Sequence, residues 1–182
     1  MQPLRYTINI TADGCCDHRE GTPNQALHEY AIEGLRRADS LLFGRITYQM
    51  MEEAWRGPSV PGARPEWMES FAVTMDAMRK YVVSSTLPQV DWNAALLRGD
   101  LKKEVLALKA QPGRGIATGG VTLPRALAAL GLIDEYEIIV HPRIAGVGPK
   151  LFDGIPAPIE LDLIGRVELA GGLTALRFQP KS

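Results

Sequence analysis

Cysteine is almost absent from this sequence: Cys15 and Cys16 are the only two among 182 residues, and they are neighbours. A disulfide between adjacent residues is strained and rare, so the sequence excludes a disulfide framework. Two reduced thiols are typical of a protein that works in the cytoplasm. We therefore expect a cytoplasmic protein.

The sequence also lacks an excess of charge of one sign and a long apolar run. Its 20 lysines and arginines balance 21 aspartates and glutamates, and no basic run occurs. This excludes the electrostatic footprint of a nucleic-acid-binding protein. No apolar stretch approaches the ~20 residues of a transmembrane helix, and residues 1–5 lead into a strand pattern rather than a signal peptide. We expect neither nucleic acid nor a membrane as a partner.

No linker, internal repeat or low-complexity segment interrupts the chain, so we expect one domain over residues 1–182. Strand and helix patterns alternate, with a capping box expected at residues 22–25 and a Gly/Pro-rich loop at residues 56–65. After residue 135 the pattern becomes β-rich. This order predicts an α/β fold in three layers, α/β/α, with a mixed, mostly parallel sheet and antiparallel C-terminal strands.

The most informative motif is a pair of glycines, Gly119 and Gly120, between an apolar run and a helix pattern. Thr122 is the expected N-cap of that helix. A strand, a glycine turn and a helix N-terminus leave backbone N–H groups facing outward, which suits the diphosphate of a dinucleotide. A Gly-Gly turn by itself is equally typical of a tight β-to-α connection.

Two other expected strands end in similar chemistry. The strand at residues 40–43 is followed by Gly44, Arg45 and Thr47, of which Thr47 is the expected cap of a short helix reaching about Trp55. The strand at residues 80–83 is followed by the hydroxyls of Ser84, Ser85 and Thr86. Because ligands of open α/β sheets bind beyond the carboxyl ends of the strands, three anion-friendly ends indicate one binding site.

These motifs and several others follow one another in a specific order and spacing along the chain. They are Thr11-Ala12-Asp13-Gly14, Phe43-Gly44-Arg45-Ile46-Thr47-Tyr48, Val82-Val83-Ser84-Ser85-Thr86, Thr118-Gly119-Gly120, Leu132-Ile133-Asp134-Glu135, and His141-Pro142 with Gly146-Val147-Gly148-Pro149-Lys150-Leu151-Phe152. In these motifs the chain resembles the dihydrofolate reductase-like superfamily, in the branch that includes the pyrimidine reductase domain of riboflavin biosynthesis. The resemblance implies an NADPH-dependent reductase acting on a small heterocycle, with a pteridine- or pyrimidine-like ring.

The resemblance also implies which residues hold the cofactor. The diphosphate would lie on the glycine turn, and its second phosphate side would be held at the helix start that follows Gly44. The cofactor-binding residues that the resemblance implies are Ala12, Gly44, Arg45, Thr47, Ser84, Ser85, Thr118, Gly119, Gly120, Val121, Thr122 and Leu123. Arg45 with Ser84 and Ser85 would meet the adenosine 2′-phosphate. Hydroxyls beside an arginine favour a 2′-phosphate, whereas NAD-specific sites usually place a carboxylate there, so NADPH is expected rather than NADH.

The loop from Asp13 to His18 is open to three interpretations. Its two cysteines, aspartates and histidine are potential metal ligands, but adjacent cysteines disfavour a metal site and we expect none. By resemblance, this loop covers the nicotinamide, so Asp17 and His18 are the candidate catalytic residues, supplying the proton that accompanies hydride transfer. Equally, a loop carboxylate and an imidazole are typical of side chains that only hold a turn in place.

One departure from the superfamily concerns the substrate. Folate-reducing members keep an acidic residue near the start of the first helix, whereas here the first helix contains no carboxylate before Glu29. This departure disfavours dihydrofolate as the substrate. A pyrimidine reductase of riboflavin-type biosynthesis and a non-catalytic NADPH-binding module remain the alternatives. His28, beside Glu29, is expected to be exposed.

A homodimer is expected from the C-terminal strands. The last one, with Leu173, Leu176 and Phe178, would leave apolar surface uncovered, and association is one way to cover an exposed sheet edge. The pyrimidine reductase branch pairs through this part of the fold. The alternative is that the loop at residues 146–158 folds back over this surface.

Overall fold

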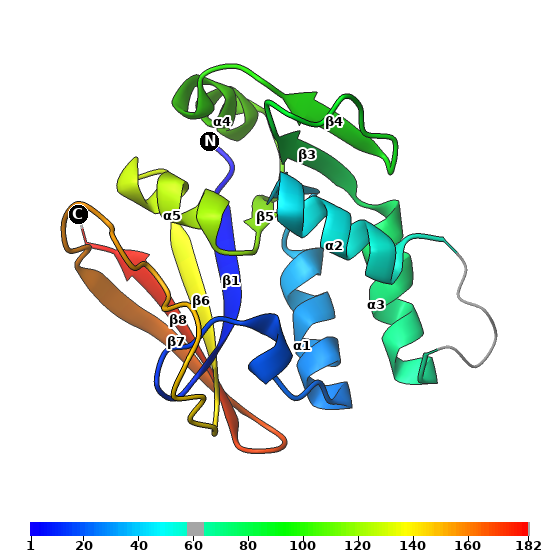
Figure 1. The fold of residues 1–182 in the computed structure, drawn as a ribbon. Coiled ribbons are helices and arrows are strands. Elements are labelled where there is room, and N and C mark those ends of the chain that lie inside the picture. The colour runs from blue at the N-terminus through cyan, green and yellow to red at the C-terminus, as the bar shows by residue number, and fades with distance from the viewer. Residues whose placement is uncertain (58–63, 182) are drawn as a thin grey trace.

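The computed structural model describes residues 1–57 and 64–181, so most of the loop predicted at residues 56–65 lies outside the described residues. The described chain alternates strands and helices and ends in an antiparallel hairpin (Figure 1). The helices are η1 (His18–Glu20), α1 (Gln25–Arg36), α2 (Arg45–Trp55), α3 (Glu66–Ala77), α4 (Leu101–Ala110) and α5 (Thr122–Ala129). The strands are β1 (Leu4–Thr11), β2 (Ser40–Gly44), β3 (Arg79–Val83), β4 (Ala94–Leu97), β5 (Ile116–Thr118), β6 (Glu135–His141), β7 (Leu161–Leu169) and β8 (Leu173–Pro180).

All eight strands form one sheet in the order β4-β3-β2-β5-β1-β6-β8-β7. The pairings from β4 to β6 are parallel, and β8 joins β6 and β7 in antiparallel fashion. The predicted mixed sheet, mostly parallel with antiparallel C-terminal strands, is therefore confirmed.

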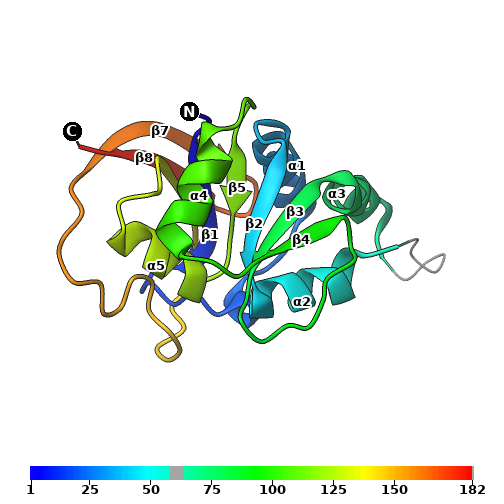
Figure 2. The ribbon, with the colours of Figure 1, turned by 90° about the horizontal axis from the view of Figure 1, so that it is seen from above.

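Helices cover both faces of this sheet, which confirms the three predicted layers (Figure 2). On one face, α4 and α5 bury Val105 and Leu127 against Leu4 and Leu42. On the other face, α1 and α3 lie side by side, and Met75 of α3 packs on the sheet together with α2. Alternate residues of β2 thus enter different cores, Leu42 one and Leu41 with Phe43 the other, as the two-residue period of a strand requires.

Three predicted helix caps are wrong. The cap of α1 is Asn24, whose side chain accepts from the Leu27 N–H at 2.9 Å, and not Thr22. Thr47 lies inside α2, which Gly44 precedes, and Thr122 is the first residue of α5 rather than its cap. Neither α2 nor α5 has a side-chain cap, so the first N–H groups of both helices remain available to another acceptor.

In the middle of the sheet, β1 and β2 separate toward their carboxyl ends, because β5 between them is short; we call this opening the split. Its three residues pair with Leu4–Tyr6 of β1 on one side and with Ser40–Leu42 of β2 on the other. Beyond Thr118 the chain leaves the sheet, while β1 continues through Thr11 beside β6. An opening therefore lies between the carboxyl ends of β1 and β2, where an open α/β sheet binds its ligands.

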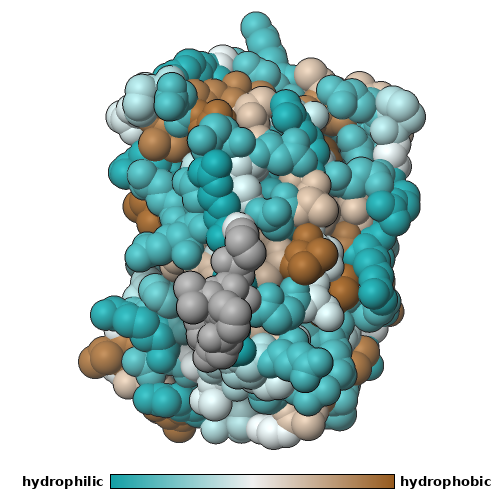
Figure 3. All heavy atoms as spheres, turned by 90° about the vertical axis from the view of Figure 1, so that its right-hand side faces the viewer, coloured by the Kyte–Doolittle hydropathy of each residue, from teal (hydrophilic) through white to brown (hydrophobic). Residues whose placement is uncertain are grey.

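The outer surface differs between the two edges of the sheet. On the face toward α3, hydrophobic residues are scattered among hydrophilic ones (Figure 3). At the opposite edge, β7 exposes Leu163 by 57% and Ile164 by 42%. The uncovered strand is thus β7 and not the last strand, whose Leu173 is buried under α1. Leu151 and Phe152 of the loop at residues 146–158 pack into the core around Tyr6.

We expect a homodimer that forms through β7, because a paired edge strand no longer exposes its backbone and its two apolar side chains. Light scattering should give a mass near twice 19.9 kDa. Ile164→Lys should shift the protein to a monomer, whereas Ile144→Lys, on an exposed loop, should not. A wild-type mass near 19.9 kDa would contradict the prediction.

Within residues 1–57 and 64–181, no helix combines the length and the apolar character needed to cross a membrane.

Candidate active site

A cavity of about 980 Å³ occupies the opening between β1 and β2. We distinguish three parts. The glycine end comprises Gly44–Thr47, Val83, Leu101, Gly119–Leu123 and Ala126; the central part comprises Thr7–Thr11, Cys15–Arg19, Gly21, His141 and Pro149; and the apolar end comprises Pro23, Leu27, His28, Met50, Met51, Trp55 and Met68. Arg45 at the start of α2 and Trp55 at its end both line the cavity, so the cavity extends along this helix.

The turn between β5 and α5 forms the wall of the glycine end. Gly120 has a φ of +87°, a conformation that other residues rarely adopt, and its carbonyl accepts a hydrogen bond of 2.8 Å from the Tyr6 hydroxyl. A Cβ on Gly120 would lie 2.2 Å from Oγ1 of Thr47, so the first turn of α2 closes tightly on the glycine. Two uncapped helix N-termini therefore converge here, which is a favourable environment for phosphate groups.

Positive charge lies along the adjacent edge of the sheet. Strand register aligns the last residues of three strands, Gly44 of β2, Val83 of β3 and Leu97 of β4. Arg45, Ser84 and Arg98 follow them and share this edge. Arg45 is exposed and donates to the Gln49 side-chain oxygen at 3.4 Å, and no carboxylate among the described residues pairs with it. Arg98, which no sequence motif indicated, donates from Nη1 to the Ser85 carbonyl at 3.3 Å.

Four of the predicted cofactor-binding residues do not line the cavity: Ala12, Ser84, Ser85 and Thr118. The Thr118 hydroxyl is buried and donates to the Leu42 carbonyl at 2.7 Å. The Ser84 hydroxyl accepts from two backbone N–H groups of its own turn, at 3.2 and 3.0 Å. The Ala12 N–H donates to the Arg143 carbonyl. Ser84 and Thr118 are buried and shape the backbone around the site, whereas Ala12 and Ser85 are exposed.

Asp17 and His18 both line the central part, but the carboxylate is engaged elsewhere. Asp17 accepts from Nε of Arg19 at 2.9 Å and from its backbone N–H at 3.0 Å. These hydrogen bonds lower the pKa of Asp17 far below its usual value, so it stays ionised at neutral pH. The His18 side chain is 71% exposed, with Nδ1 3.7 Å from the carboxylate. Since Asp17 is ionised, it is not a proton donor, which leaves His18 as the remaining candidate.

The neighbouring loop residues have structural partners. Asp13 accepts from the backbone N–H groups of Ala145 and Gly146 and pairs with Lys150 at 3.1 Å. Cys16 donates to the Pro149 carbonyl at 3.3 Å, and burial raises the pKa of its thiol. In the part of the chain that the structure describes, no group of three or more potential ligands is arranged to hold a metal ion.

His141 closes the floor of the central part. Its Nδ1 accepts from the Thr22 N–H at 3.4 Å, so the proton resides on Nε2, which donates to the Asn9 side-chain oxygen at 3.0 Å. Burial lowers the pKa of His141 and keeps the ring neutral. The histidine thus ties the loop before α1 to β1. Asn9 is exposed although its strand is central, because the sheet opens beside it.

The apolar end is built by α1, α2 and α3. His28 is partly buried here rather than exposed, which corrects the sequence prediction. Its ring packs edge-on against Trp67 and Phe71, with centroids 4.7 and 5.6 Å away, and lies 6.0 Å from Trp55. Its Nδ1 is 3.1 Å from the Asn24 carbonyl, an acceptor, so Nδ1 carries the proton. Helical spacing alone did not reveal that these aromatic residues converge.

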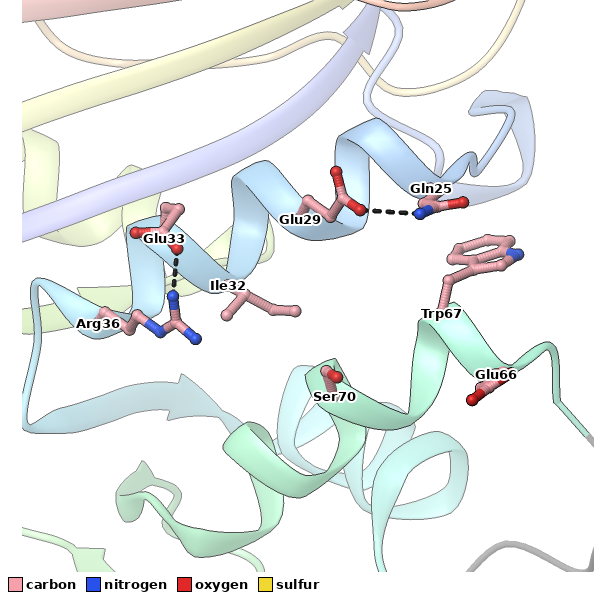
Figure 4. Close-up of a pocket in the computed structure, with 8 residues that line it drawn as sticks. All are labelled: Gln25, Glu29, Ile32, Glu33, Arg36, Glu66, Trp67 and Ser70. Carbon is pink, nitrogen blue, oxygen red and sulfur yellow. Dashed lines mark hydrogen bonds and ion pairs between the residues drawn. The ribbon is translucent and has the colours of Figure 1, made fainter.

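A second, shallower hollow of about 550 Å³ lies between α1 and α3 (Figure 4). Two pairs of its polar side chains interact with each other: Gln25 donates to Glu29 at 2.8 Å, and Arg36 pairs with Glu33. Glu29 therefore faces this hollow and does not line the cavity at the split.

Taken together, the split sheet, the glycine turn and the elongated cavity define a dihydrofolate reductase-like α/β protein. The chain belongs to the RibD C-terminal domain family, whose model matches residues 3–174. The domain of this family is a reductase domain, so the protein is an oxidoreductase.

Individual relatives agree with this assignment. The uncharacterized protein YyaP of Bacillus subtilis strain 168 is 26% identical over 176 residues, covering 94% of this chain and 91% of YyaP. A putative riboflavin biosynthesis protein from Shewanella sp. PV-4 shares the fold over the full length of both chains, with a TM-score of 0.76 at 20% identity. Dihydrofolate reductase from Enterococcus faecalis, solved with NADP(H), has a TM-score of 0.65 at 11% identity, covering 99% of this chain and 97% of that chain.

Proposed function

We propose that this protein is a cytoplasmic NADPH-dependent reductase of a small heterocycle. The observation that supports it best is the glycine end, where two uncapped helix N-termini face a turn without side chains and two arginines share the adjacent edge. A dinucleotide with a 2′-phosphate fits this chemistry, because backbone N–H groups bind a diphosphate and guanidinium groups bind a phosphate monoester. The solved Enterococcus faecalis neighbour, which contains NADP(H), supports the same choice.

The chain's own residues then have separate tasks. Gly119, Gly120 and the first turn of α5 would hold the diphosphate, and Arg45 with Arg98 would face the 2′-phosphate. When bound, NADPH supplies the hydride, so the protein needs no nucleophile of its own. The substrate would lie beyond it, in the central part and the apolar end. His18 would deliver the proton, while Asp17 holds the loop through Arg19.

Calorimetric titration with NADPH and NADH tests the proposal. We expect NADPH to bind more tightly by on the order of tenfold to a hundredfold, since charge-assisted hydrogen bonds to a phosphate contribute ~1.5–3 kcal/mol. Equal affinity for the two nucleotides would refute NADPH specificity. Binding of neither would refute the reductase assignment of this cavity.

Dihydrofolate is expected to be turned over weakly or not at all. Glu29, the first carboxylate of α1, lies in the hollow between α1 and α3, and Asp17 is held ionised by Arg19. Neither is placed to grip and protonate a pterin. Robust NADPH oxidation that depends on dihydrofolate would contradict this prediction, and its loss in Asp17→Asn but not in Glu29→Gln would identify the residue responsible.

A further inference from the structure

We propose that the apolar end of the cavity binds a neutral, planar heteroaromatic ring that carries no phosphate, with His28 as the residue that hydrogen-bonds to its edge. This inference rests on the proposed function, because it describes the second ligand of the same cavity. It separates this chain from a protein of Thermotoga maritima with a similar fold (TM-score 0.65 at 15% identity, covering 99% of this chain and 57% of that chain), whose name includes 5-amino-6-(5-phosphoribosylamino)uracil reductase and thus a phosphorylated compound.

The walls of the apolar end favour a flat and weakly polar ligand. Its lining side chains, apart from one, are hydrocarbon, thioether or indole: Pro23, Leu27, Met50, Met51, Trp55 and Met68. Methionine side chains adapt to the faces of aromatic rings and make favourable sulfur–aromatic contacts. An indole contributes a large, rigid stacking surface. A charged group placed here would lose its hydration without a compensating partner.

The positive charges near the cavity are accounted for elsewhere. Arg19 is committed to Asp17, with contacts at 2.9 and 2.5 Å. Arg45 begins α2 and Trp55 ends it, so about ten residues at ~1.5 Å each separate them along the helix axis. Residues 58–63 contain no lysine, arginine or histidine in the sequence.

Arg56, next to Trp55, pairs with Glu52 at 2.7 Å and with Asp91 at 2.8 Å, which leaves Arg64 to consider. Its guanidinium lies 5.4 Å from the centre of the Trp55 ring, a cation–π contact, and it is not among the residues that line the cavity. Its Nη1 is buried without a hydrogen-bond partner among the described residues, so Arg64 is the cation whose role the experiment below must test. Among the described residues, no lysine or arginine lines the apolar end.

His28 supplies the polar contact. Its Nδ1 proton is used by the Asn24 carbonyl, which fixes the tautomer and leaves Nε2 with a lone pair in the neutral ring. Edge-on packing against Trp67 and Phe71 fixes the plane of the imidazole. A ring N–H of the ligand is the complementary partner. One polar contact within an apolar wall sets the orientation of a planar ligand, as in many small-molecule sites.

Three probes that share one ring system test the inference: lumichrome, riboflavin and flavin mononucleotide add first a ribityl chain and then a phosphate. Binding is measured by calorimetry on the protein saturated with NADP⁺, so that the glycine end is occupied. We expect lumichrome to bind most tightly and flavin mononucleotide no more tightly than riboflavin. His28→Phe, which keeps an aromatic ring against Trp67, should weaken lumichrome binding by about tenfold, the loss of one hydrogen bond, and leave NADP⁺ affinity unchanged.

The outcomes separate the two proposals. Failure of NADP⁺ to bind the wild type refutes the proposed function itself. With NADP⁺ bound, a preference of tenfold or more for flavin mononucleotide over riboflavin overturns the inference, and loss of that preference in Arg64→Ala would show that Arg64 binds the phosphate. Absence of lumichrome binding up to about 1 mM, or unchanged lumichrome affinity in His28→Phe, overturns it as well.

Discussion

Gly120→Ala is expected to lower the affinity for NADPH by on the order of a hundredfold, which corresponds to ~2.7 kcal/mol. The added Cβ would lie 2.2 Å from Oγ1 of Thr47 and would occupy a position with a φ of +87°. Either the turn or the first turn of α2 must move, and both belong to the proposed diphosphate site. Calorimetry measures the affinity, and thermal unfolding of the same variant measures the cost to the fold.

Gly131→Ala is the matched control. Gly131 has a φ of +65° just after α5, and a Cβ there would meet no atom within 4 Å. The variant therefore has the same backbone penalty, ~1 kcal/mol, without the steric clash and away from the cavity. We expect a modest loss of stability and an unchanged affinity for NADPH. Equal effects of the two substitutions on affinity would show that the glycine turn is not the diphosphate site.

Arg45→Ala is expected to abolish most of the preference for NADPH over NADH. The guanidinium lies at the start of α2 and has no carboxylate partner among the described residues, so its charge is available to a 2′-phosphate. Its removal should weaken NADPH binding by tenfold to a hundredfold, ~1.5–3 kcal/mol, and leave NADH binding almost unchanged. Titration of both nucleotides gives the ratio directly.

Two further variants complete this experiment. Arg166→Ala removes an exposed arginine of β7 that pairs with Glu168, so it controls for a general change in net charge. Arg98→Ala tests the second guanidinium of the same edge and should reduce the preference to a smaller extent, because that side chain also donates to backbone carbonyls. A preference that survives in Arg45→Ala would place the 2′-phosphate elsewhere.

Local patterns in the sequence were sufficient to predict the order and type of the elements. The hydrophobic repeats mark α4 and α5, and the glycine turn marks the end of β5, because both signals arise between near neighbours in the chain. The helix caps were less predictable. Thr22, Thr47 and Thr122 are all acceptable cap residues, and the structure uses none of them. At α2 and α5 a side-chain cap would occupy the backbone N–H groups that face the cavity.

The candidate site was only partly predictable, since long-range packing decides which side chains meet. The glycine end follows from motifs at three strand ends. His28 and Trp55 come from different helices, and nothing in either helix pattern indicates that they approach each other. The position of Arg98 beside the site depends on the register between β3 and β4. The hydrogen bond from His141 to Asn9 joins two strands that are distant in the sequence. Such pairs become visible once the sheet order is known.

The short length of β5 has a consequence for the backbone of β1. Over Arg5–Tyr6 this strand is paired on both sides, whereas from Thr7 to Thr11 it is paired with β6 alone. Although β1 lies in the middle of the sheet, its second half therefore behaves as an edge strand, with peptide groups open to solvent or to a ligand. Amide hydrogen exchange should reveal this division within one strand. The open half should exchange faster than the closed half in the free protein, and occupation of the cavity should slow it.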